Sequence, residues 1–185
     1  MSAMSWRTKI VFTSDHGDTL GDHGHSQKWT MYDIVTRVPL IVWSPNRLAR
    51  GQVIRALTQQ MDIGATVLEL AGVKIPDPFE ARSLLPLLEG QTANGRQYVF
   101  AEQGRDGILR ETDLVTMVRS ADWKLVHFLS ENFGQLFDLN HDPGEMTNLW
   151  NDQRFESVKT DLLGVLRDWL VRSNYQTREW SANWR

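Results

Sequence analysis

Hydrophobic positions in the first 95 residues are grouped as in buried strands that alternate with helices. The apolar runs at 10–12 and 38–45 show no alternation of apolar and polar residues, which is typical of strands covered on both faces. Between them, the segment 28–37 (KWTMYDIVTR) predicts a short helix. Strand, helix and strand make a βαβ unit, so we expect the two strands to pair in parallel through a right-handed crossover.

A second helix is predicted downstream, because apolar residues between positions 63 and 71 recur at helical spacing. Asp62 is placed to cap its start and Gly72 to end it. The stretch 82–90 (RSLLPLLEG) predicts one or two helical turns with Ser83 as the N-cap.

The pattern changes after residue 95, where short β-like runs are separated by turn residues. A final helix is expected over 153–172, with one apolar stripe of Val158, Leu162, Val165, Leu166 and Trp169. The β-like runs cover residues 98–103, 113–120, 122–129 and 135–139. We therefore predict an α/β unit with a parallel sheet over residues 1–95 and a small antiparallel sheet plus helix over residues 96–185.

The composition is that of an ordinary globular protein and narrows the function only by exclusion. The chain has 185 residues, a formal net charge of −3 and 41% hydrophobic residues. This balance gives no reason to expect binding to nucleic acid or to an anionic membrane, and no apolar run is long enough for a membrane helix. The absence of cysteine excludes disulfides, thiolate metal sites and a cysteine nucleophile. It leaves the cellular compartment open.

Metal-capable side chains are concentrated in the segment 13–28, TSDHGDTLGDHGHSQK. Asp15 and His16 directly follow the first strand, and ligands of open parallel sheets bind beyond the carboxyl ends of strands. A carboxylate and an imidazole at that place are reasonable metal ligands, although two donors do not complete a site. Gly17 would let the backbone turn sharply or approach a ligand closely.

Lys28 follows this pair at a distance that lets it fold back over the same strand end. An ammonium near a divalent cation is unfavourable unless an anion lies between them, so the three side chains together would indicate a bound sulfate or phosphate group. Other interpretations stay open at this point. The aspartate could cap a helix, the lysine could simply begin one, and His23 and His25 could belong to a loop.

The sequence resembles the C-terminal part of the sulfatases, in the alkaline-phosphatase-like superfamily, from about Lys9 to about Leu170. The segments that carry the resemblance occur in the family's order: IVFTSDHGDTLGDHGHSQKWTMYD, RVPLIVWSP, MDIGATVLELAGV, RSLLPLLEG and LFDLNHDPGEMTNL. The resemblance implies a sulfuric-ester hydrolase in which Asp15 and His16 bind a divalent cation and Lys28 contacts the sulfate. Calcium is the expected metal, with manganese or magnesium as alternatives.

The nucleophile of that family is a formylglycine, made from the first residue of a Cys/Ser-x-Pro-x-Arg motif. The sequence contains no such motif, so we expect no catalytic residue in this chain and no turnover by the chain alone. Histidine at position 16 resembles bacterial sulfatases and related phosphonate and phosphodiester hydrolases. A fragment of such a hydrolase, or a non-catalytic module that binds an anion or a partner, is therefore the alternative.

The partner implied by the resemblance is a sulfate ester, bound by the parent enzyme. A chain that opens on a core strand suggests that an upstream part of the sheet is missing. We then expect the strand at 10–12 to lie at a sheet edge and the chain to form homo-oligomers or to associate through that edge.

Overall fold

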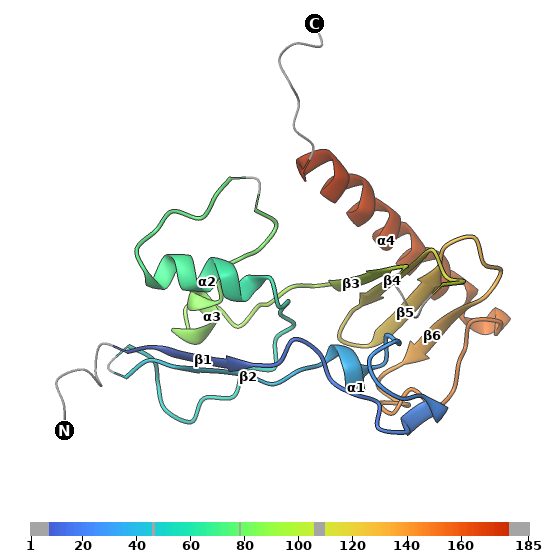
Figure 1. Cartoon of the computed structure of the whole chain (residues 1–185), viewed down its shortest axis with the longest axis horizontal. Coiled ribbons are helices and arrows are strands. Elements are labelled where there is room, and N and C mark those ends of the chain that lie inside the picture. The colour runs from blue at the N-terminus through green and yellow to red at the C-terminus, as the bar shows by residue number, and fades with distance from the viewer. Residues whose placement is uncertain (1–7, 46, 78, 106–109, 178–185) are drawn as a thin grey trace, which may run out of the picture.

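The computed structural model describes residues 8–45, 47–77, 79–105 and 110–177. These residues form two sheets in separate parts of the molecule (Figure 1): a two-stranded ribbon with two short helices near it, and a four-stranded sheet that carries the long C-terminal helix. The elements are, in chain order, β1 (Ile10–Thr13), η1 (Asp22–Gly24), α1 (Asp33–Thr36), β2 (Leu40–Trp43), α2 (Asp62–Leu70), α3 (Leu85–Leu88), β3 (Val99–Gly104), β4 (Leu114–Arg119), β5 (Trp123–Phe128), β6 (Gly134–Asp138), η2 (Gln153–Phe155) and α4 (Glu156–Thr177).

Strands β1 and β2 form the ribbon, and they pair antiparallel rather than parallel as predicted. Their register places Ile10 opposite Trp43 and Thr13 opposite Leu40. The residues that follow β1 and those that precede β2 also lie side by side. There the Gly17 amide donates a hydrogen bond to the Val35 carbonyl at 2.8 Å. The connection therefore leaves β1 and returns beside it, and α1 is too short to act as a crossover helix.

The helix expected over 28–37 is wrong for most of its length, since α1 covers only Asp33–Thr36. The reason is tertiary. The Met31 carbonyl accepts a hydrogen bond from Lys124 at 3.1 Å, and the Asp33 amide donates to Glu145 at 2.6 Å. Two distant side chains thus bind the backbone groups that a longer helix would use internally.

The two helices after the ribbon are confirmed as α2 and α3, with a correction at the start of each. Asp62 is the first residue of α2 and accepts from the Gln59 amide at 3.0 Å, so its carboxylate fixes the preceding loop instead of capping the helix. Gly72 ends α2 with φ of 72°, as predicted for a residue in the left-handed region. The prediction of Ser83 as the N-cap of α3 is wrong by one residue, because the N-cap is Leu84. Ser83 Oγ still accepts from the Leu85 amide at 3.2 Å.

The four-stranded sheet and its helix confirm the second half of the prediction. The strands run in the order β3-β4-β5-β6, each antiparallel to its neighbour. Helix α4 packs on one face with its apolar stripe, where Leu162 and Leu166 join Val118, Leu125 and Leu136 in a fully buried cluster. Each such side chain contributes about 1.5–3 kcal/mol to the free energy of folding.

The opposite face of this sheet is covered by the N-terminal part of the chain. Met31 packs there against Val115, Met117 and Val126 in a second buried cluster. Because side chains alternate across a strand, Arg119 and Lys124 point to this same face. The division at residue 95 stays a prediction. Within the described parts of the chain, no helix is long and apolar enough to cross a membrane.

Candidate functional site

Asp15 and His16 lie directly after β1, and their side chains converge. His16 Nδ1 is 2.7 Å from the Gly17 carbonyl. A carbonyl only accepts, so Nδ1 carries a proton and donates, and the neutral ring then has its lone pair on Nε2. Nε2 is 3.5 Å from Asp15 Oδ2. A carboxylate oxygen and an imidazole lone pair at this separation repel one another unless a cation or a proton lies between them.

The Asp15 carboxylate is held in its charged form. The hydrogen bond from the His16 amide lowers its pKa, the His16 ring lowers it further when that ring is protonated, and the Lys28 ammonium adds to the effect. Its side chain is 84% exposed, so the group is open to a ligand from solvent or from another part of a protein. The carboxylate therefore has the protonation state that a metal ligand needs.

Lys28 lies in the same cavity as this pair. The cavity has a volume of about 920 Å³, and its lining includes Asp15, His16 and Lys28. The ammonium is exposed and lies 5.6 Å from the centre of the Trp29 ring. All three candidate residues thus line one cavity, and Lys28 is close enough for its charge to lower the pKa of Asp15.

Gly17 is required for a different reason from the one predicted. A Cβ on this residue would lie 1.9 Å from the Ile34 carbonyl oxygen and 3.2 Å from Val35 Cα. The close approach is between two backbone segments of the same chain, where the runs from β1 and β2 continue side by side. This contact fixes where Asp15 and His16 stand relative to α1.

Gln60 is a residue of the site that sequence reasoning missed. Its Nε2 donates to the Ser14 carbonyl at 2.7 Å and to the Asp15 carbonyl at 3.2 Å. These bonds attach the loop before α2 to the strand end that carries the metal-capable pair. The local sequence around a glutamine in a polar loop contains no pattern that would predict this role.

The loop before α2 is itself anchored by a buried ion pair. Asp62, 1% exposed, accepts from Arg96 Nη2 at 2.5 Å and Nε at 2.9 Å, and from the Arg82 amide at 2.8 Å. Burial alone raises the pKa of Asp62, but these hydrogen bonds, the Gln59 amide and the Arg96 charge outweigh it and hold the pKa below its ordinary value.

The second Asp-His-Gly sequence, at Asp22–Gly24, is loop architecture. It forms the short turn η1, and His23 stacks on Tyr32 with ring centres 3.7 Å apart. Asp18 Oδ1 accepts from the amides of Leu20 and Gln27, which closes the loop. Among the residues described, no group of three or more His, Asp or Glu side chains is arranged to hold a metal ion.

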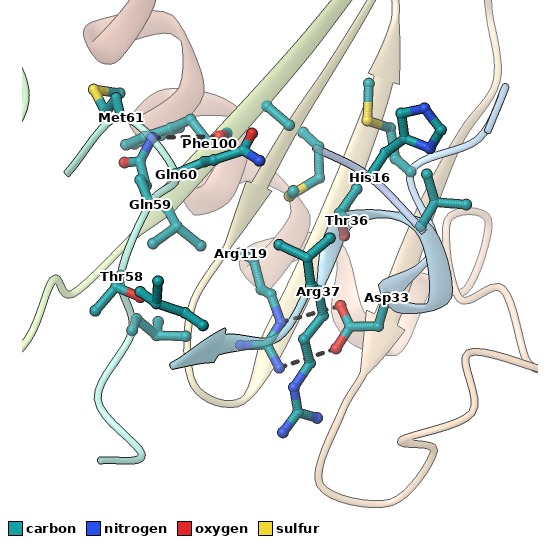
Figure 2. A pocket seen from close by; sticks show the side chains of 18 of the residues that line it. His16, Asp33, Thr36, Arg37, Thr58, Gln59, Gln60, Met61, Phe100 and Arg119 are labelled. Atoms are coloured by element: carbon teal, nitrogen blue, oxygen red, sulfur yellow. Dashed lines mark hydrogen bonds and ion pairs between the residues drawn. The ribbon is translucent and has the colours of Figure 1, made fainter. Parts of the chain in front are cut away.

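A buried charge cluster of Asp33, Arg119, Lys124 and Glu145 joins the site to the four-stranded sheet. Lys124 is fully buried and forms ion pairs with Asp33 and, at 2.5 Å, with Glu145. Arg119 contacts Asp33 at 3.3 Å (Figure 2). Burial raises the pKa of Asp33, but the two cations and their hydrogen bonds outweigh this effect and lower it. The cluster holds the segment after Lys28 against the sheet.

Comparison with known proteins identifies the family of this chain. Residues 21–171 match the family described as N-sulphoglucosamine sulphohydrolase, C-terminal. The N-acetylglucosamine-6-O-sulfatase of Bacteroides thetaiotaomicron is 31% identical over 165 residues, which are 87% of this chain and 30% of that protein. The chain therefore belongs to the sulfatase C-terminal family.

Solved structures support the same assignment and confirm the alkaline-phosphatase-like fold class. A 2-O GAG sulfatase superposes with a TM-score of 0.84 and 29% identity, over 96% of this chain and 40% of that one. A phosphonate monoester hydrolase from Silicibacter pomeroyi superposes with a TM-score of 0.76 and 30% identity, over 94% of this chain and 36% of that one. This chain thus spans between three and four tenths of the length of these relatives.

Proposed function

We propose that the chain supplies one wall of a sulfatase active site. In this wall Asp15 and His16 bind a divalent cation, and Lys28 contacts the sulfate group of the ester. The observation that carries the proposal is the 3.5 Å approach of Asp15 Oδ2 to His16 Nε2. The hydrogen bond from Nδ1 to Gly17 orients the imidazole, which is how metal-binding histidines are commonly fixed.

The donor set fits a divalent cation only as part of a larger site. One carboxylate and one imidazole are two ligands, whereas a calcium site takes six to eight and a zinc site four. We propose calcium first, with manganese or magnesium as alternatives, and further ligands from outside this chain. When bound, such a cation polarises the ester oxygen, while Lys28 stabilises negative charge on the sulfate.

The chain alone is expected to bind sulfate weakly and not to hydrolyse its esters, because the sequence has no nucleophile motif. With calcium present, a titration with sulfate followed by NMR should shift the signals near Lys28, and Lys28→Ala should remove these shifts. Lys74→Ala is the matched control, since this lysine is 81% exposed and does not line the cavity. Hydrolysis of an aryl sulfate that is lost in Lys28→Ala would contradict the proposed lack of a nucleophile.

A phosphonate or phosphodiester hydrolase is the second candidate for the parent activity. The observation that favours it is the phosphonate monoester hydrolase structure, whose identity to this chain is as high as that of the sulfatase structure. Both ester types place a tetrahedral anion on the same cation and lysine. The chain can be titrated with methylphosphonate and with sulfate in parallel. The anion that binds more tightly would show which of the two parent activities is favoured.

We also propose that the chain associates through the β1–β2 ribbon. Among the residues that the structure describes, each of the two strands pairs only with the other, so both edges of the ribbon are open. One face of the ribbon carries four exposed apolar side chains that lie opposite one another in pairs. These are Ile10 with Trp43 and Phe12 with Ile41, exposed by 51%, 44%, 58% and 59%. Water-exposed apolar surface of this kind favours a protein contact.

Light scattering should therefore show dimers or larger species, and Phe12→Ser should shift them toward the monomer. Leu20→Ser is the control, because Leu20 is equally apolar and 87% exposed but lies in the loop after the strand. A monomer at high concentration, or an equal effect of both substitutions, would contradict association through the ribbon.

A further inference from the structure

Asn94 and Gly95 form the one Asn-Gly sequence of the chain. They lie in the segment that leads from α3 to β3, outside both sheets (Figure 1). An asparagine that precedes glycine is prone to deamidation, because glycine has no side chain to hinder attack of its amide nitrogen on the neighbouring side-chain amide. The reactivity of the pair in a folded chain then depends on how its two reacting groups are held.

Both reacting groups are free of hydrogen bonds in this fold. Asn94 is exposed, and in the described part of the chain its side-chain amide has no hydrogen-bond partner. The Gly95 amide likewise donates to no acceptor among the described residues. The backbone N–H of Asn94, which takes no part in the reaction, donates to Thr92 Oγ1 at 3.1 Å. The side chain can therefore turn toward the Gly95 nitrogen without breaking a hydrogen bond.

The packing around Gly95 requires a glycine at this position. A Cβ on this residue would lie 2.6 Å from the Leu57 carbonyl oxygen and 2.7 Å from Ala56 Cβ. Atoms of another segment thus occupy the space that a side chain would need. The same close approach that stabilises the fold therefore keeps a reactive pair at positions 94 and 95.

The residue that follows this pair holds the loop before α2 in place. The Arg96 amide donates to the Leu57 carbonyl at 3.0 Å, and the Arg96 guanidinium binds Asp62 and, at 3.1 Å, the Glu80 carbonyl. Arg96 is only 13% exposed. A change in the length of the backbone directly before Arg96 must therefore disturb this set of bonds.

We propose that Asn94 is a site of spontaneous modification, at which the chain supplies the nucleophile and water is the only co-reactant. The Gly95 amide nitrogen gives up its proton and bonds to Asn94 Cγ. The bond between Cγ and Nδ2 breaks, and Nδ2 leaves as ammonia with that proton. The succinimide ring that results takes up a water molecule and opens at either carbonyl. The products are aspartate and isoaspartate, and nothing is oxidised or reduced.

Isoaspartate is the product that changes the backbone. Its main chain runs through Cβ and Cγ, so that a methylene group is added between Asn94 Cα and the Gly95 nitrogen. The former main-chain carbonyl becomes a carboxylate, which is ionised near pH 7. Because the backbone at Gly95 has no free space beside the neighbouring segment, the added length should displace Arg96 and weaken its bonds to Asp62.

The effect should reach the strand end that carries Asp15. Asp62 fixes the loop before α2, and Gln60 of that loop donates to the Ser14 and Asp15 carbonyls at 2.7 and 3.2 Å. Modification at position 94 should therefore loosen the attachment of this strand end. The contacts that carry the effect are all within the chain, so the proposal does not depend on the proposed function.

The modification can be followed in the purified chain during storage in mildly alkaline buffer. In the tryptic peptide 83–96, where Asn94 is the one asparagine, mass spectrometry detects the exchange of NH₂ for OH, and an isoaspartate-specific methyltransferase labels the rearranged product. Asn94 should be modified while Asn132, also exposed but followed by phenylalanine, stays intact. Asn94→Gln should abolish the labelling, because glutamine would have to form a larger ring. Asn132→Gln should leave it unchanged.

The structural consequence can be measured on the same aged chain by NMR. The Arg96 amide, which the Leu57 carbonyl protects, should exchange its hydrogen about tenfold faster in the isoaspartate form, the factor that corresponds to the loss of one hydrogen bond. The signals of Ser14 and Asp15 should shift. Asn94→Gln stored in the same way is the control and should show neither change.

An intact Asn94 in the stored, folded chain would overturn the proposal. A free peptide of residues 91–97 that is modified under the same conditions would then show that the fold protects the pair. Isoaspartate that forms without a change at Arg96 or Ser14 would refute the proposed consequence. Modification of Asn94 and Asn132 at equal rates would show general deamidation instead of a site that Gly95 creates. All of these results are independent of sulfate binding by Lys28.

Discussion

Replacing Lys124 with methionine should lower the free energy of unfolding by about 3–5 kcal/mol, the cost of breaking a buried ion pair from one side. Methionine fills a similar volume but removes the charge. Asp33 and Glu145 would then be left close together and largely buried without their shared cation, and the Met31 carbonyl would lose its donor. Denaturation with urea, followed by circular dichroism, measures the change.

Lys74→Met is the matched control for this experiment. Lys74 pairs with Asp77 at the surface, where both side chains are more than 80% exposed, and such pairs contribute at most about 1 kcal/mol. Equal effects of the two substitutions would show that the buried charge cluster does not hold the N-terminal part of the chain against the four-stranded sheet.

Replacing Asp62 with asparagine should cost a similar amount, about 3–5 kcal/mol near pH 7. The change leaves Arg96, only 13% exposed, without its counter-charge and weakens the bonds to the Gln59 and Arg82 amides. Because the same aspartate anchors the loop of Gln60, the substitution should also broaden the NMR signals of Ser14 and Asp15.

The pH dependence of stability gives a second test of this ion pair. The pKa of Asp62 is lower in the folded chain than its ordinary value of about 3.9. Its contribution is therefore complete above about pH 4 and is lost as the pH falls further through the folded pKa. The wild-type unfolding free energy should decline below about pH 4, and Asp62→Asn should show a shallower decline. The remaining decline comes from the other aspartates whose pKa is lowered in the folded chain, Asp33 among them. Asp77→Asn, at an 85% exposed position, should leave the curve unchanged.

The C-terminal half of the fold was predictable because its signals are local. Strands β4 and β5 are rich in β-branched and other apolar residues and flank a tight turn, and the apolar stripe of α4 has a regular helical period. Burial of Leu162 and Leu166 follows from that period alone. Here local propensity and tertiary packing favour the same structure.

The N-terminal half depends on contacts that the local sequence does not contain. An unbroken apolar run such as Ile10–Phe12 fits parallel and antiparallel pairing equally, so the orientation of β1 and β2 could not be read from it. The helix predicted over 28–37 is shortened by Lys124 and Glu145, which follow it by about ninety residues or more. Asp15, His16 and Lys28 could be proposed from the sequence because they lie in one short segment, whereas Gln60 reaches the strand end only through the fold.

The most direct test of the proposed site is a titration of the chain with Mn²⁺, which broadens the NMR signals of residues near a bound ion. We predict that signals of Asp15, His16 and Gly17 broaden first and that Asp15→Asn with His16→Ala abolishes the effect. The chain offers an internal control in Asp138 and His141, a carboxylate–imidazole pair 2.8 Å apart at the end of β6, in which the His141 side chain is exposed. Broadening that is centred on this second pair, or that persists in the Asp15 and His16 variant, would contradict the assignment of the metal-binding wall.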